Sequence, residues 1–158
     1  MNISVYKDNG LNDVNNISLI EKQLNYSLPQ SYKDIVKNHD ALRSENDIFD
    51  FMDIYGKPND RDVSFYSFKQ NHIDGFIIEE QDNINDPDNG GIKGLVTFAF
   101  TANGDYICFD YRENPNGDNP KIVLVYHDDI VENVDGTRSM VVNFVANSFE
   151  EFMDMLRD

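Results

Sequence analysis

The acidic side chains are the groups in this sequence most able to do chemistry, since Asp and Glu make up 29 of its 158 residues. Asp105 and Asp110 lie at the two ends of one apolar run, the arrangement closest to a general acid–base pair. We expect simpler roles for both. Asp105 should stabilise the preceding turn by accepting from nearby backbone N–H groups, and Asp110 should face solvent or accept from Arg112 or a loop N–H. We predict no catalytic residue; a metal-dependent hydrolase built on Asp105 and Asp110 is the weakest hypothesis left open.

Residues that hold metal ions are few and do not fit a metal-binding pattern. A calcium loop beginning at Asp86 would have Asp88 and Gly91 at its third and sixth positions, but Thr97 stands where a bidentate Glu is needed. Zinc sites need clustered Cys and His, and this chain has one Cys and three scattered His. We predict no metal site and no cofactor.

Cys108 is the only thiol in the chain, and it lies between Ile107 and Phe109 in an apolar run. That position is typical of a buried small hydrophobic residue rather than of a nucleophile. His127 could act as its base, but no spacing requires it.

Charge is the strongest global signal, because 29 acids against 13 bases give a net charge of -16. Such a field repels nucleic acid and anionic membranes and favours a basic partner. Solubility alone explains the same charge equally well.

We predict that acidic segments flanking a sheet form a docking patch for a basic protein. They are two acidic loops, Asp82–Asp88 and His127–Asp129, with Asp110–Arg112 at a strand end between them. Each segment alone is typical of a solvated surface. The candidate partner-binding residues are Glu79, Glu80, Asp82, Asp86, Asp88, Asp110, Arg112, Asp128 and Asp129.

The stretch from Leu95 to Tyr126 should position these side chains. It holds three runs rich in Val, Ile, Phe and Tyr, which suit strands: Leu95–Phe100, Tyr106–Tyr111 and Ile122–Tyr126. Asn103-Gly104 between the first two runs tolerates positive φ at both central positions of a tight hairpin turn. The polar segment Arg112–Pro120 is typical of a loop. The pattern predicts three consecutive antiparallel strands.

Three helices are indicated outside this stretch. The first begins after Asn12 or Asp13, and the second begins at Pro29 and ends near His39–Ala41. The third follows Ser148 and Glu151, whose side chains should cap each other's backbone N–H groups. The expected apolar face of the first helix is Ile17, Ile20 and Leu24, and that of the second is Tyr32, Ile35, Val36 and His39. The expected apolar face of the third is Phe149, Phe152, Met153 and Leu156.

The remaining segments give weaker predictions. Residues 1–12 look weakly structured. A short strand or a helical turn is indicated at Phe49–Ile54, a short strand at Met140–Val145, and a turn at Gly56–Asp60. Val63–Phe68 and Phe76–Ile78 are compatible with strand or helix, and the topology of residues 43–91 stays open.

Taken together, the elements predict one α+β domain over residues 1–158. We expect a mostly antiparallel twisted sheet, with the N-terminal helix pair and the C-terminal helix packed against it. No apolar run approaches the ~20 residues that span a bilayer, and no signal peptide is evident. With a single cysteine, these features favour the cytoplasm.

The order of four short motifs resembles that of the SUKH superfamily, which includes yeast cell-wall regulators and many bacterial immunity proteins. The resemblance covers about Asp13 to the end of the chain. The motifs are Ile20-Glu21-x-x-Leu24 with Leu28-Pro29-x-x-Tyr32-Lys33; Gly104-Asp105 followed by Asp110; Asn119-Pro120-x-Ile122-Val123 followed by His127-Asp128; and Ser148-Phe149-Glu150-Glu151-Phe152.

The resemblance implies a non-enzymatic role: binding a cognate toxin domain and neutralising it by occluding its active or substrate-binding surface. Nucleases are frequent among the toxins of the family, and the acidic charge suits a basic toxin. The alternative is an intracellular adaptor or regulatory module of the same fold. The resemblance does not locate the partner-binding surface, because partners differ within the family.

Overall fold

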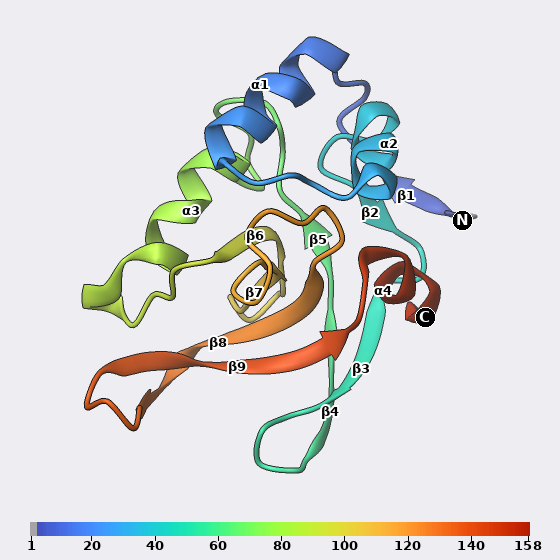
Figure 1. The fold of residues 1–158 in the computed structure, drawn as a ribbon. Coiled ribbons are helices and arrows are strands. Elements are labelled where there is room, and N and C mark those ends of the chain that lie inside the picture. The colour runs from blue at the N-terminus through green and yellow to red at the C-terminus, as the bar shows by residue number, and fades with distance from the viewer. Residues whose placement is uncertain (1–2) are drawn as a thin grey trace.

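The computed structural model describes residues 3–158 and contains nine strands, four α-helices and one 3-10 helix (Figure 1). The helices are α1 (Val14–Leu24), α2 (Gln30–Asn38), α3 (Ile77–Asn85), η1 (Pro87–Asn89) and α4 (Phe149–Met155). The strands are β1 (Val5–Lys7), β2 (Arg43–Ser44), β3 (Ile48–Met52), β4 (Pro58–Asp62), β5 (Ser64–Phe65), β6 (Leu95–Phe100), β7 (Tyr106–Asp110), β8 (Lys121–Glu132) and β9 (Arg138–Ala146). None of these helices is long and apolar enough to cross a membrane.

A five-stranded antiparallel sheet in the order β5-β6-β7-β8-β9 forms the centre of the fold. The three predicted strands are its β6, β7 and β8, and Cys108 of β7 lies opposite Thr97 and Val123 on its neighbours. The predicted fold class is confirmed: four helices accompany mostly antiparallel strands in one α+β fold.

One face of the sheet carries the main core, which α1, α2 and α4 cover as predicted. Tyr32 of α2 is fully buried at the centre of this core, with Phe98, Phe109 and Phe149 packed edge-on around its ring. The apolar spacing of the three helices therefore predicted their buried faces correctly. His39 and Leu156 are the exceptions, because each follows the last residue of its helix and is half-buried.

Helix α3 lies beside β6 in Figure 1, and its C-terminal part packs on the opposite face of the sheet. Its Ile84 packs with Cys108 and Val125 in a second, smaller core. Its Gln81 side chain bonds the strand backbone twice, because Nε2 donates to the Thr97 carbonyl (2.7 Å) and Oε1 accepts from the Thr97 N–H (3.0 Å). Since β5 pairs only with Ala99 and Phe100, this amide occupies the part of the β6 edge that β5 leaves open.

The three hairpins β3–β4, β6–β7 and β8–β9 share one turn design. In each, a glycine with positive φ donates its N–H to the carbonyl three residues earlier: Gly56 to Asp53 (3.0 Å), Gly104 to Thr101 (2.9 Å) and Gly136 to Asn133 (3.0 Å). Only Gly104, and not Asn103, has positive φ, so the expected two-residue turn is wrong. A three-residue loop with a glycine bulge takes its place.

Several predictions for the polar segments are wrong, because tertiary pairing overrides weak local patterns. Residues 1–12 include β1, which pairs with β2. Pro58–Asp60, predicted within a turn, begins β4. The expected loop Asp82–Asp88 contains the end of α3 and the beginning of η1. His127–Asp129, predicted as an acidic loop, lies within β8, which continues to Glu132.

The cap of α4 forms almost as expected. Ser148 Oγ accepts from the Glu151 N–H (3.1 Å), as predicted. The Glu151 carboxylate instead accepts from the N–H of Asn147 (2.8 Å), one residue before the predicted partner. The first bond satisfies a donor that the first helical turn leaves free, and the second holds the residue before the cap.

Candidate partner-binding surface

The two carboxylates considered for acid–base chemistry lie at opposite ends of β7 and do not form a pair. Five residues of strand separate them by about 17 Å. Asp105 is 2 % exposed, and its carboxylate accepts from the His127 N–H (3.1 Å), His127 Nδ1 (2.7 Å) and Arg61 Nε (3.3 Å). The expectation that Asp105 stabilises its own turn is therefore wrong, because its carboxylate connects β7 to β8 and β4.

Asp110 behaves as predicted, since it accepts from the Arg112 N–H (3.0 Å), Nε (2.9 Å) and Nη2 (2.9 Å). Burial opposes ionisation of this carboxyl, but the bonds from Arg112 outweigh burial and leave the pKa of Asp110 below its ordinary value. Asp110 is therefore an ionised partner of Arg112 rather than a proton donor.

Asp105, His127 and Asp128 bring one potential metal-ligand atom each within 4.8 Å of one another. The Asp105 oxygens already accept from His127 and from Arg61, and the guanidinium would oppose a bound cation. These contacts account for Asp105 and His127 as parts of a structural network.

Cys108 is fully buried in the smaller core, and burial raises the pKa of its thiol well above the ordinary value. The ring of His127, which the sequence allowed as a base for this thiol, bonds the Asp105 carboxylate instead. Cys108 therefore packs as a small hydrophobic residue, as its sequence position indicates.

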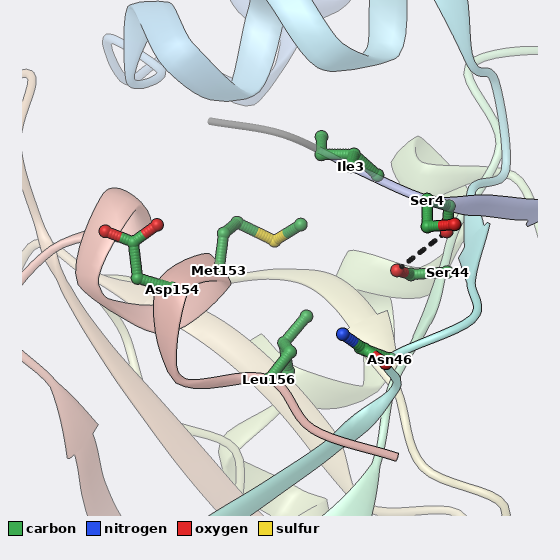
Figure 2. Close-up of a pocket in the computed structure, with 7 residues that line it drawn as sticks. All are labelled: Ile3, Ser4, Ser44, Asn46, Met153, Asp154 and Leu156. Carbon is green, nitrogen blue, oxygen red and sulfur yellow. Dashed lines mark hydrogen bonds between the residues drawn. The ribbon is translucent and has the colours of Figure 1, made fainter.

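Two of the pockets of the described chain are too small for a substrate. Figure 2 shows one of about 80 Å³ between the N-terminal segment and the end of α4. Its lining residues are Ile3, Ser4, Ser44, Asn46, Met153, Asp154 and Leu156. A second, of about 110 Å³, lies in the loop after β7. Small-molecule sites usually enclose roughly 300–1,000 Å³.

Five predicted partner-binding acids gather on α3 and η1 and form what we call the acidic strip: Glu79, Glu80, Asp82, Asp86 and Asp88. Among residues 3–158, none of them lies within 4.0 Å of a basic side chain. Burial raises the pKa of Glu80, and the carboxylates of Glu79 and Asp82 raise it further. Asp86 also caps η1, since it accepts from the Asp88 N–H (3.0 Å).

The outer half of β8 carries two more predicted acids and adjoins the end of the strip. Asp128 is exposed, and Asp129 accepts from the Tyr55 hydroxyl at 2.7 Å. Gly90, directly after η1, accepts at its carbonyl from the Met140 N–H (2.9 Å), and Met140 lies opposite Ile130 of β8. The fold therefore places the end of the strip beside outer β8.

Asp110 and Arg112 lie far from the predicted acids of outer β8. Asp110 is opposite Lys121, the first residue of β8, while Asp128 is seven residues further along that strand. At the usual rise of a strand this is about 23 Å.

A hairpin with exposed apolar residues, which the sequence patterns did not single out, contacts Asp129 through Tyr55. Met52, Ile54 and Tyr55 of the β3–β4 hairpin are each more than half exposed. One signal was available, because Asp53-Ile54-Tyr55-Gly56 has the glycine spacing of the Asn133–Gly136 turn but carries apolar central residues.

Comparison with known families places the chain in one of them. The model of the SMI1/KNR4 family (SUKH-1) matches residues 12–155, which include α1, α2, the whole central sheet and α4. No curated protein matches the chain. The match extends over far more than half of the 158 residues, and the chain therefore belongs to the SMI1/KNR4 family, SUKH-1.

Proposed function

We propose that this chain is an immunity protein that binds a cognate protein toxin domain and occludes its active or substrate-binding surface. The observation that carries the proposal is membership of the SMI1/KNR4 family over residues 12–155, because the resemblance to the SUKH superfamily implies toxin-neutralising proteins. The role is one of binding, without catalysis by this chain.

The charge of the molecule supports a basic partner. The net charge is -16, and the acidic strip and outer β8 concentrate carboxylates that have no ion pair within residues 3–158. Like charges on one face raise the electrostatic energy of the free protein, and a positively charged partner relieves it.

Occlusion follows from the same charge. A toxin that acts on nucleic acid carries a basic substrate-binding surface. An acidic protein seated there competes with the phosphates for the same side chains, and its field speeds the encounter. We propose a nuclease domain as the toxin on this ground.

Co-expression tests the proposal. The toxin domain encoded by the neighbouring reading frame is expressed in a host cell, with and without this chain. We expect survival only when this chain is present, together with a stable complex of the two purified proteins. Unchanged toxicity would overturn the immunity function, and a complex with a housekeeping protein in the absence of any neighbouring toxin gene would favour the adaptor.

A further inference from the structure

The tip of the β3–β4 hairpin has a tyrosine at a position where its two related hairpins have polar residues. Ile54 and Tyr55 precede Gly56 and are 54 % and 59 % exposed. At the position of Tyr55, the other turns have Asn103 and Asp135, and both side chains bond residues of their own turn. The tyrosine is therefore not required by the turn, and its hydroxyl bonds outside it.

The tip is held firmly in spite of its exposure. Asp53 Oδ1 accepts from the N–H groups of Tyr55 and Lys57, both at 2.9 Å. The Ile54 N–H donates to Oδ1 of the buried Asn143 (3.0 Å) on β9. The Tyr55 hydroxyl donates to Asp129 on β8. Because contacts to two strands of the sheet fix it, this apolar surface loses little conformational entropy when a partner binds.

Charge indicates which partner suits this surface. Asp129 offers its second carboxylate oxygen beside the ring of Tyr55, and Asp128 lies next to it in β8. The hairpin turn contributes one base, Lys57. An aromatic ring next to a carboxylate is a good receptor for an arginine or lysine side chain, which can stack on the ring and pair with the oxygen.

We propose that the hairpin tip, defined as Met52, Ile54 and Tyr55 with Asp129, is the anchor that binds the basic surface of the toxin domain. An arginine or lysine of the toxin packs on Tyr55 and pairs with Asp129, while apolar toxin atoms cover Ile54 and Met52. This inference rests on the proposed function and gives the two surfaces different kinetic roles. The acidic strip speeds association with the toxin, and the tip slows dissociation of the complex.

The experiment uses the full chain and the neighbouring toxin domain, inactivated at its catalytic centre. Affinity and dissociation rate are measured for Tyr55→Ala, Ile54→Ser, Asp129→Asn and the control Val134→Ser. Val134 has the position of Ile54 in the β8–β9 turn and is fully exposed. We expect Tyr55→Ala and Ile54→Ser to raise Kd at least about tenfold, mainly through faster dissociation. Asp129→Asn should raise Kd about fivefold, and the control should keep Kd within about twofold of the original value.

Two further measurements keep the outcome clear. Tyr55→Phe keeps the ring and loses the hydroxyl, so it should bind better than Tyr55→Ala, and thermal unfolding shows whether each variant is folded. Hydrogen exchange on the complex should protect residues 52–57 and 127–132. Tip variants that bind within about twofold of the original protein, or protection confined to residues 79–88, would overturn the anchor and leave the immunity function standing. Absence of any binding by the original chain would overturn the proposed function itself.

Discussion

Tyr32 presents an unusual feature at the scale of single residues, because its buried hydroxyl has no hydrogen-bond partner among residues 3–158. Tyr111 lies in the same core, but its hydroxyl donates to the Ser27 carbonyl at 2.6 Å. An unpaired buried hydroxyl lowers stability, whereas a paired one contributes about 1 kcal/mol. The two tyrosines therefore form a natural comparison.

We expect Tyr32→Phe to leave the free energy of unfolding unchanged or raise it by up to about 1 kcal/mol, because no bond is lost. The control Tyr111→Phe should lower it by about 1 kcal/mol, since the Ser27 carbonyl loses its donor. Urea unfolding followed by circular dichroism measures both. A loss of more than about 1 kcal/mol in Tyr32→Phe would mean that a buried water pairs with the hydroxyl.

Glu80 makes stability depend on pH. Burial and the neighbouring carboxylates raise its pKa in the folded protein, so the folded state holds the proton more tightly than the unfolded chain. The resulting stabilisation is present below the ordinary Glu pKa and is lost as pH rises through the folded pKa.

We therefore expect Glu80→Gln to melt at a higher temperature than the original protein at pH 7, with the difference disappearing near pH 4. The control is Glu132→Gln, which removes one negative charge at an exposed position of β8. Scanning calorimetry across this pH range makes the comparison. Equal gains for both variants at pH 7 would mean that net charge, rather than the burial of Glu80, is responsible.

Among the elements, those with regular apolar spacing could be predicted and those held by tertiary contacts could not. The three-residue and four-residue spacing of Ile17, Ile20 and Leu24 was enough to place α1. In contrast, α3 fully buries only Ile77 and Ile84, and its residues other than these and Ile78 are as polar as a loop. The sequence Pro58–Asp62 has no apolar alternation and becomes β4 only by pairing with β3.

The candidate partner-binding surface also has a part that could be predicted from the sequence and a part that could not. Sequence alone identified the acids of the strip, because charged side chains stay at the surface whatever element carries them. It could not show that Tyr55 reaches Asp129, since 74 residues separate them in the chain. Nor could it show that Asp110 lies at the far end of β8, because that depends on strand register.

Gln81 offers a test at the scale of elements, since its amide links α3 to the open edge of β6. We expect Gln81→Ala to lower the free energy of unfolding by about 2 kcal/mol, because two backbone groups of Thr97 lose their partners. The Thr97 amide should also exchange its hydrogen faster. Gln23→Ala, the same change at an exposed position of α1, should have little effect. Unchanged exchange at Thr97 would contradict this role.

The charge of the whole molecule leads to a prediction about association with the toxin domain. The net charge of -16 acts over a long range at low salt, because the Debye length is ~30 Å at 0.01 M. At 0.15 M the Debye length is only about 8 Å, and the field of the protein is screened within that distance. We expect the association rate constant to fall at least about tenfold between these ionic strengths, while dissociation changes little. Stopped-flow measurements over a salt series determine both rates.

The position of the charge can be separated from its amount. Glu79→Gln, Asp82→Asn and Asp88→Asn together remove three exposed charges from the acidic strip and keep Asp86, which caps η1. The control removes three exposed charges elsewhere: Glu113→Gln, Asp118→Asn and Asp154→Asn. Both triple variants carry the same net charge. If only the net charge mattered, the loss of three charges would slow association equally in the two.

If the strip faces the incoming toxin, the first variant associates several-fold more slowly than the second at low salt. The two association rates converge as salt screens the difference. Equal rates at every ionic strength would show that the toxin approaches another face.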